Sequence, residues 1–367
     1  MPTGTGAAVL SSLPEVPYTL DTAQFMAKTE KNHQPLDVVP TPGPGNTTTF
    51  TLPRSGVAST LKLKFIGNLD VTTSGPTFGP RWPYGLLDGF KLSAGLGSDL
   101  WDVNGLDLTA LKAVNHPYVT NNLVDQFPGA VGGGTVPAVG NFPLYLSYEI
   151  PLAVDQTSLI ASLFLQSSSG TIQCQIAQAL THNLQQASGE SDADWTITGT
   201  WYPELVLWDI PVDQKGALIL PEVNRLHMVV GIDQAITGTG RQPAPVQRTA
   251  GVLQRLFLRG ELSPQSFLSA LPSAASTDLI DQIQINYGLI NTPIIFNPAS
   301  TLAEANNSDY GQPLPYDTYV WDTLRQNPAR DAILLQGVTN LQALMYVDPA
   351  VTVPAGAVTR VIEEILV

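Results

Sequence analysis

Charge, cysteine and histidine are all scarce in this sequence. Only 13% of the 367 residues are Asp, Glu, Lys or Arg, about half of the usual quarter, and the formal net charge is -14. A soluble chain ordinarily keeps charge on its water-facing surface, so this shortage predicts that other chains cover much of the surface. The 17 Lys and Arg residues are scattered singly, which argues against direct binding to nucleic acid.

Other absences exclude further classes of protein. The single cysteine, Cys174, excludes an internal disulfide and a zinc site built from cysteines. No apolar stretch with a small-residue cleavage site precedes Lys28, so no secretion signal is expected. The segment between Asp155 and Glu190 carries no charged side chain, but serines and glutamines interrupt it. It is therefore not a membrane span.

What the sequence has in abundance is turn residues and two-residue alternation. The 31 glycines and 30 prolines are about one residue in six, against about one in eight on average. Apolar side chains occupy alternate positions in residues 61–71, where Gly67 predicts a bulge. The same pattern returns in residues 142–150, 172–176, 195–201 and 283–287. Strands with one buried and one polar face are typical of antiparallel sheets.

Helical signals are few and short. We expect one helix from an N-cap at Asp21 to about Lys31 and a second over residues 106–114. Residues 263–270 and 316–325 are further helix candidates. Because helices and strands do not alternate regularly, an α/β fold is disfavoured, and the prediction is an all-β chain with small inserted helices.

Two turn-rich segments, at residues 40–45 and 209–216, divide the chain. They predict an N-terminal arm with a short helix at residues 1–36, followed by two jelly-roll β-sandwiches in tandem, at residues 37–212 and 213–367. A faint internal repeat supports this division, since residues 61–69 resemble residues 253–262.

Three segments resemble one family in their order and spacing. They are residues 84–108, with the text YGLLDGFKL and LWDVNGLDL, residues 144–165, which begin LYLSYEIPLA, and residues 195–221. Together they resemble the major capsid protein of tectivirus-like phages, a double jelly roll of the lineage that also contains adenovirus hexon. The likeness spans most of residues 47–367 and is clearest in the first half.

The resemblance implies a structural protein of the virion. Three copies would form a homotrimer with a pseudo-hexagonal outline, and these capsomers would tile an icosahedral shell around an internal membrane and double-stranded DNA. The implied partners are neighbouring capsomers and other virion proteins at the vertices, without direct contact to nucleic acid, after assembly in the cytoplasm of a host bacterium. Permanent contacts of this kind bury apolar surface, which would account for the scarcity of charge.

No catalytic, cofactor-binding or metal site is predicted, and we expect no enzyme. Walker-type phosphate loops, Gly-x-Ser-x-Gly and His-Glu-x-x-His are absent from the sequence. The histidines lie far apart, at His33, His116, His182 and His227. A site assembled from distant residues stays open, and the alternative function is a two-sandwich carbohydrate-binding or glycan-cleaving spike or wall protein.

Several residues have two interpretations. Cys174 lies on the apolar face of its strand and is expected in the core rather than as a nucleophile. The acidic residues Glu190, Asp192 and Asp194 could bind calcium, but a solvated loop is the favoured interpretation. A cluster of aromatic residues could stack on sugars, although strand spacing favours a core role: Trp195, Trp201, Tyr202 and Trp208.

Two long turn-rich segments and the N-terminal arm are candidates for contacts with other proteins or with lipid. Residues 126–141 and 297–315 are expected to be long loops at contacts or towers of the shell. Residues 126–141 could form a receptor-binding tip, but a flexible connection over the outer surface is the favoured interpretation. In the arm, Phe25 and Met26 give the short helix an apolar side, and Lys28 and Lys31 could reach lipid headgroups or neighbouring carboxylates. We therefore expect residues 1–36 to clamp neighbouring capsomers or to touch the membrane.

Overall fold

The computed structural model describes residues 17–367 apart from several short segments. These segments are residues 74–76, 80, 94–98, 116–124, 130–133, 137–138, 167–170, 185–193, 249, 264–265, 268–279, 287–292, 312–313, 315–317, 324–332, 337, 339–340, 351 and 354. Within the described residues, strands dominate, and the α-helices are three short ones. The prediction of an all-β fold with small inserted helices is confirmed.

The first half of the chain forms a sandwich of two four-stranded sheets. Its strands are β2 (Lys31–Pro35), β4 (Thr47–Thr51), β5 (Val57–Val71), β7 (Leu87–Ser93), β8 (Asp99–Val103), β10 (Gly140–Pro151), β12 (Gln173–Gln178) and β13 (Trp195–Trp208). One sheet has the order β2-β13-β5-β10 and the other β4-β12-β7-β8. Short strands β3 (Val39–Pro40) and β11 (Leu163–Phe164) extend the first sheet, and β6 (Thr77–Phe78) pairs with β9 (Gly134–Thr135).

The second half repeats this architecture. Its strands are β15 (His227–Ala235), β16 (Gly240–Pro245), β17 (Val252–Ser263), β19 (Ile280–Asn286), β20 (Ile294–Phe296), β21 (Thr318–Asp322), β23 (Gln342–Val347) and β24 (Val358–Leu366). One sheet has the order β15-β24-β17-β21 and the other β16-β23-β19-β20. The short strands β18 (Ser266–Phe267) and β22 (Ile333–Leu334) also pair with β17.

The two halves have the same topology. When the eight strands of each half are numbered along the chain, both halves have one sheet in the order 1-8-3-6 and one in the order 2-7-4-5. This is the Greek-key arrangement of a jelly roll. The third strands, β5 and β17, even share a bulge at their third residue, since Ser59 and Gln254 are both skipped in the pairing with the eighth strand. The prediction of two jelly rolls in tandem is confirmed.

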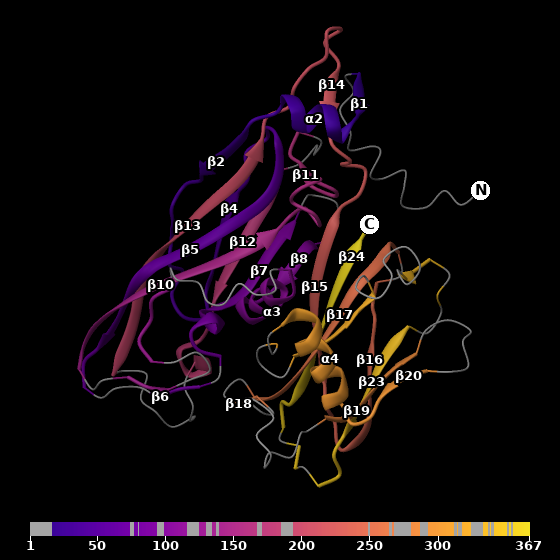
Figure 1. Cartoon of the computed structure of the whole chain (residues 1–367). Coiled ribbons are helices and arrows are strands. Elements are labelled where there is room, and N and C mark those ends of the chain that lie inside the picture. The colour runs from indigo at the N-terminus through magenta and orange to yellow at the C-terminus, as the bar shows by residue number, and fades with distance from the viewer. Residues whose placement is uncertain are drawn as a thin grey trace.

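The two jelly rolls are joined edge to edge. β8, at the edge of the first, pairs in parallel with β15, at the edge of the second, with Val229 opposite Trp101 and Val230 opposite Asp102. A single ten-stranded sheet therefore runs through both halves. Figure 1 shows the first half at upper left, in indigo to magenta, and the second at lower right, in orange to yellow, with β8, β15 and β24 between them.

Alternation of apolar residues along the strands builds two cores. The first contains Leu61, Leu63 and Phe65 of β5, and the second contains Leu256 and Leu258 of β17, all with no exposed surface. Each such burial contributes roughly 1.5–3 kcal/mol. The predicted strands at residues 61–71, 142–150, 172–176, 195–201 and 283–287 are confirmed, although β5 begins four residues before the prediction, β19 begins three before it and β13 ends seven after it.

The predicted bulge at Gly67 is wrong. The register of β5 with β13 and with β10 runs through Gly67 without a shift. Gly67 lies opposite Gly199, where a Cβ atom would come 2.1 Å from the carbonyl oxygen of Thr198. The glycine pair is required by this close approach of two backbones, and the Phe65 ring covers it.

The helix predictions are partly confirmed. α2 (Thr22–Lys28) begins at the predicted N-cap, Asp21, but ends before the predicted Lys31, which begins strand β2. α3 (Gly105–Asn115) matches the predicted helix. Residues 318–322 of the candidate at 316–325 instead form strand β21, because β-branched and aromatic residues there pair with β17. The candidate at 263–270 includes β18, and its other residues after Ser263 lie outside the described residues.

The predicted loop at residues 297–315 contains helix α4 (Ser300–Tyr310). It connects β20 to β21 as α3 connects β8 to β10, so both helices join the fifth strand of a jelly roll to the sixth. The sequence pattern did not predict this helix because most of its residues are polar or small. Only Leu302, Asn306 and Tyr310 are buried against the protein. Of the predicted loop at 126–141, Gln126 bridges to Tyr145 and residues 130–133 and 137–138 lie outside the described residues.

The described part of the arm, residues 17–36, packs on its own chain. β1 (Tyr18–Leu20) pairs in parallel with β14 (Leu218–Leu220), and Phe25 of α2 is fully buried against Ile219 and Leu220. Because β2 is the first strand of the first jelly roll, we propose that this domain begins at Lys31 rather than at residue 37. The boundary at residues 212 and 213 lies in the hairpin before β14 and stays a prediction.

Candidate functional site at the junction of the two jelly rolls

The outer face of the sheet β15-β24-β17 lies against the first jelly roll. Phe257 of β17 and Ile362 of β24, opposite each other in register, have no exposed surface and belong to the core of the first half. Around them lie Arg259, Glu261 and Arg360. We call these five residues the covered face.

Asp107 of α3 is the centre of the charges on the covered face. Its side chain is fully buried, and its two oxygens divide between two arginines of the second jelly roll. Oδ1 lies 2.9 Å from Nη1 of Arg259, and Oδ2 accepts hydrogen bonds from Nε and Nη2 of Arg360 at 3.0 and 2.9 Å. Asp107 therefore ties a helix of the first jelly roll to two strands of the second.

The start of α3 holds Asp107 in place. The backbone N–H of Asn104 donates to Oδ2 of Asp107, and the backbone N–H of Asp107 donates to Oδ1 of Asn104, at 3.0 and 2.9 Å. This reciprocal pairing satisfies a backbone donor at the start of the helix. Gly105 is required beside it, because a Cβ atom there would come 2.0 Å from the carbonyl oxygen of Tyr84.

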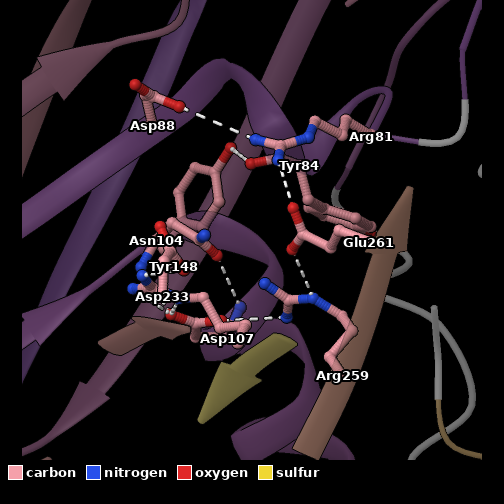
Figure 2. Close-up of polar contacts among 10 residues, drawn as sticks. Arg81, Tyr84, Asp88, Asn104, Asp107, Tyr148, Asp233, Arg259 and Glu261 are labelled. Carbon is pink, nitrogen blue, oxygen red and sulfur yellow. Dashed lines mark hydrogen bonds and ion pairs between the residues drawn. The ribbon is translucent and has the colours of Figure 1, made fainter. Parts of the chain in front are cut away.

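The ionic contacts continue on both sides of Asp107 (Figure 2). Arg259 donates through Nε to Glu261 at 2.9 Å, and Glu261 also accepts from Nη2 of Arg81 in the first jelly roll. Arg81 lies 3.8 Å from Asp88, and Arg360 donates to Asp233 at 2.9 Å. The seven residues form one chain of alternating charge: Asp88, Arg81, Glu261, Arg259, Asp107, Arg360 and Asp233.

The arginines keep these buried carboxylates charged. Burial by itself would raise the pKa of Asp107, but Arg360 and Arg259 outweigh it and hold that pKa below its ordinary value. The pKa of Glu261 is lowered in the same way, against its burial, by Arg259 and Arg81. Removing either partner of such a pair leaves an uncompensated buried charge, so the network fixes how the two jelly rolls fit together.

A second ionic group lies at the same junction, near the end of β8. Arg255 of β17 donates to Glu364 of β24 at 2.9 Å, to Asp322 of β21 at 3.0 Å and to Asn115 at the end of α3 at 2.8 Å. The imidazole of His227 lies 3.0 Å from Glu364 through Nε2 and 2.7 Å from the carbonyl oxygen of Pro151 through Nδ1. Both neighbours are acceptors, so both contacts are hydrogen bonds when the ring carries two protons.

The equivalent face of the first jelly roll is open. Matching the two bulges aligns Lys62, Lys64 and Ile66 of β5 with Phe257, Arg259 and Glu261 of β17. Pairing with β5 then aligns Tyr202 and Glu204 of β13 with Arg360 and Ile362. We call Lys62, Lys64, Ile66, Tyr202 and Glu204 the open face.

The open face is partly exposed where the covered face is buried. Ile66 is 45% exposed and Tyr202 40%, whereas Phe257, Arg259 and Ile362 have no exposed surface. Lys64 pairs with Glu204 at 2.6 Å, and His33 contacts the same carboxylate at 2.8 Å. Hydrogen bonds from Lys64 and His33 lower the pKa of Glu204 to about 2.

One groove of the described surface shows no arrangement for catalysis. Its volume is about 520 Å³, and it lies between residues 34–40 and 48–53. Asp37 is the one charged residue among those that line it. Among the described residues, no group of three His, Cys, Asp or Glu side chains could hold a metal ion, and no helix is long and apolar enough to cross a membrane.

Comparison with known proteins finds no relative in sequence but several in structure. No protein-family model and no curated protein matches the chain. The major capsid protein of Sulfolobus turreted icosahedral virus superposes with a TM-score of 0.68 at 15% identity, covering 92% of this chain and 96% of that one. The Faustovirus major capsid protein gives 0.58 at 7% identity, covering 92% and 90%, and protein P2 of bacteriophage PM2 gives 0.51 at 10%, covering 91% and 97%.

The chain has the double jelly-roll fold of viral major capsid proteins. The likeness covers both jelly rolls and the junction between them, because more than nine tenths of this chain superposes. The resemblance found in the sequence is confirmed at the level of the fold.

Within the double jelly roll, the aromatic cluster belongs to the core. Trp201 has no exposed surface and Trp195 is 2% exposed, so neither offers a platform for a sugar. Trp208 is partly buried and donates to the hydroxyl of Ser59, and Tyr202 lies on the open face. The core interpretation is confirmed for Trp195 and Trp201.

The other candidate residues lie apart. Cys174 is fully buried, and burial raises the pKa of its thiol, as expected for a core thiol. His33 lies on the edge strand β2 and His227 at the junction, while His116 and the side chain of His182 lie outside the described residues. Of the acidic cluster, Glu190 and Asp192 also lie outside them, and Asp194 is the neighbour of β13.

Sequence reasoning missed the residues of the covered face. Arg259 and Arg360 interrupt apolar strands, and a charged residue in such a position is a signal for a buried partner. The sequence does not say which partner, because Asp107 lies 253 residues from Arg360.

Proposed function

We propose that this chain is a major capsid protein, a non-enzymatic structural component of an icosahedral virion. The observation that carries the proposal is the pair of topologically identical jelly rolls joined edge to edge, which superposes along almost its whole length on viral major capsid proteins. The net charge of -14 and the scarcity of charge agree with a protein that contacts its own kind rather than a genome.

The finer proposal is a homotrimer with a pseudo-hexagonal outline. Two similar sandwiches per chain supply six similar units in three chains, which supports this arrangement. Such capsomers would tile the shell and meet other virion proteins at the vertices. Light scattering after size exclusion is the test: a particle of three times 39.2 kDa supports the proposal, and a monomer at all concentrations contradicts it.

The internal membrane, the double-stranded DNA genome and assembly in a bacterial cytoplasm are proposed from the sequence resemblance. The bacterial host stays a prediction, since the fold is shared by a Sulfolobus virus and by bacteriophage PM2. Contact of residues 1–36 with lipid or with neighbouring capsomers also stays a proposal. Phe25 cannot be the apolar anchor of this contact, because it is buried in its own chain, whereas Lys28 and Lys31 are exposed and remain available for it.

Deletion of residues 1–16 tests the contact proposed for the arm. It leaves β1, α2 and β2 in place, so trimers are expected to persist while shells no longer form. Normal shell assembly by the truncated chain would contradict a contact made by residues 1–16. The carbohydrate-binding alternative is not favoured, because Trp195 and Trp201 are buried.

A further inference from the structure

The junction inside the chain is a head-to-tail contact between two similar units. The edge of the fifth strand of the first unit, β8, meets the edge of the first strand of the second unit, β15. α3, which follows β8, lies over the covered face through Asp107. One side of a jelly roll is therefore complementary to a different side of the next.

The same two sides remain unoccupied at the two ends of the chain. β2 is the first strand of the first unit and pairs with β13, and β20 is the fifth strand of the second unit and pairs with β19. Among the described residues, no strand pairs with the other edge of either. All five residues of β2 are exposed, and Ile295 of β20 is 51% exposed. Figure 1 shows β2 and β20 on opposite sides of the molecule.

The register of the two free edges follows from the junction. β2 pairs with β13 as β15 pairs with β24, and the two bulges align β13 with β24. In this alignment His33 and Gln34 of β2 are equivalent to Val229 and Val230 of β15. In β8, Asp102 lies between the buried Trp101 and Val103, and in β20 the exposed Ile295 lies between the partly buried Ile294 and Phe296. Since Val230 is opposite Asp102, the counterpart of that pair is Gln34 with Ile295.

We propose that β20 of one copy lies parallel to β2 of the next copy, with Ile295 opposite Gln34, and that the side of the second jelly roll carrying α4 covers the open face of that neighbour. The contact between chains thus repeats the junction within the chain. This inference rests on the proposed function, because it assigns the surface by which a capsid protein would associate. Repeated head to tail, such contacts close a ring when the rotations between successive units add up to one full turn.

The open face fits a surface that is covered only after folding. Ile66 and Tyr202 expose apolar area, yet the charges of Lys64 and Glu204 are already paired with each other. The Lys64–Glu204 pair of the open face therefore needs no partner from another unit, whereas Arg259 and Arg360 at the junction depend on Asp107 of the other jelly roll. A separate chain can therefore fold alone and associate afterwards, which the covered face could not permit.

A cross-linking experiment tests the register. Partners in adjacent strands lie about 5 Å apart, within the range that a disulfide spans. The double variant Gln34→Cys/Ile295→Cys is expected to give covalent dimers and trimers on mild oxidation. Cys174 is buried and does not interfere. The matched control is Gln34→Cys/Val212→Cys, in which Val212 is also exposed but lies in the hairpin before β14. It is expected to stay uncross-linked.

A second experiment tests the surface without a disulfide. Ile295→Lys places a charge on the proposed contact and is expected to abolish trimers in light scattering. Leu334→Lys is the matched control, because Leu334 is 55% exposed on the short strand β22, which pairs with β17 and with neither β2 nor β20. It should leave trimers intact. Far-ultraviolet circular dichroism should show both variants folded, since both side chains are exposed.

The outcomes separate this inference from the proposed function. Trimers of the natural chain that persist in Ile295→Lys, with no cross-link in Gln34→Cys/Ile295→Cys, overturn the proposed surface and leave the capsid function standing. A natural chain that never self-associates overturns both. The inference is supported if Gln34→Cys/Ile295→Cys forms cross-links and if Ile295→Lys loses its trimers while Leu334→Lys keeps them.

Discussion

The covered face and the open face occupy the same place in two jelly rolls of identical topology, and their side chains differ as their surroundings differ. Phe257 and Ile362 fill a core where the open face carries Lys62 and Glu204, which are part-exposed in their sheet. Where charges do occur on the covered face, each meets an opposite charge. The shared topology therefore gives the two faces the same backbone arrangement. The burial of each face determines which side chains occur at its equivalent positions.

The comparison also separates two uses of ion pairs. At the junction, Asp107 is fully buried between two arginines, so the geometry is unique and its loss is costly. On the open face, the side chains of Lys64 and Glu204 are 30% and 21% exposed, and water can replace either partner. The first arrangement specifies how two units dock, and the second keeps a surface soluble until another chain covers it.

The strongest test exchanges residues between the two faces. Phe257→Lys places the residue of the open face in the covered face and is expected to cost more than about 4 kcal/mol, because a lysine would be buried without a partner. The reciprocal Lys62→Phe should change the free energy of unfolding by about 0.5 kcal/mol or less. Denaturant unfolding of both variants measures the difference, and equal effects would contradict the comparison.

The next largest effect is expected when the ion pairs of Asp107, at the centre of the junction, are removed. Asp107→Ala leaves Arg259 and Arg360 without their shared carboxylate, and we expect a loss of about 3–5 kcal/mol in the free energy of unfolding. Asp233→Ala removes the other carboxylate that pairs with Arg360. Because the side chain of Asp233 is 55% exposed, the free energy of unfolding should fall by about 1 kcal/mol or less. Similar losses for the two variants would show that the network does not govern the docking.

Acid should weaken the junction through Glu364. Burial would raise its pKa, but Arg255 and His227 lower it to about 2 from the ordinary 4.5. Its contribution, about 3 kcal/mol, is therefore complete above pH 4.5 and lost as the pH falls towards 2. Glu363 has the opposite effect on stability. Burial raises the pKa of this carboxyl group, so its protonation in acid removes the cost of keeping a charge buried.

Unfolding measured between pH 6 and pH 2 is the check on this prediction. Glu364→Gln should have a flatter dependence on pH than the natural chain. A profile as steep as that of the natural chain would rule out Glu364 as the source of the acid sensitivity.

The smallest effect is expected on the open face. Removing the Lys64–Glu204 pair with Glu204→Gln should cost about 0–1 kcal/mol in the isolated chain. A double-mutant cycle with Lys64→Met isolates the interaction between the two side chains. A coupling as large as that expected at Asp107 would mean that the open face is already structured like the covered one.

Local patterns predicted much of the fold. The alternation in β5, β10, β12, β13 and β19 marked these strands, since a half-buried strand needs only its own sequence to show its two faces. The weak repeat between residues 61–69 and 253–262 marks the two equivalent strands, β5 and β17. The bulges correct its register, because Leu61 corresponds to Leu256 rather than Leu253.

Local patterns failed where distant strands decide the outcome. Residues 318–322 are a strand because β17 offers an edge, and the helix α4 is stabilised by its contact with β21 through Asn306. Neither partner is visible within the local window of sequence. The same holds for the covered face, whose charges belong to segments more than 100 residues apart.

The sequence by itself determined that this protein is all-β, is built as two similar sandwiches and is short of charge, because alternation, turn residues and composition are properties of neighbouring residues. Tertiary structure alone decided that β8 meets β15, that Asp107 lies between Arg259 and Arg360, and that an equivalent face stays open at the other end of the chain. Those relations depend on which edges and faces come together, and burial fixes their energy only once they have.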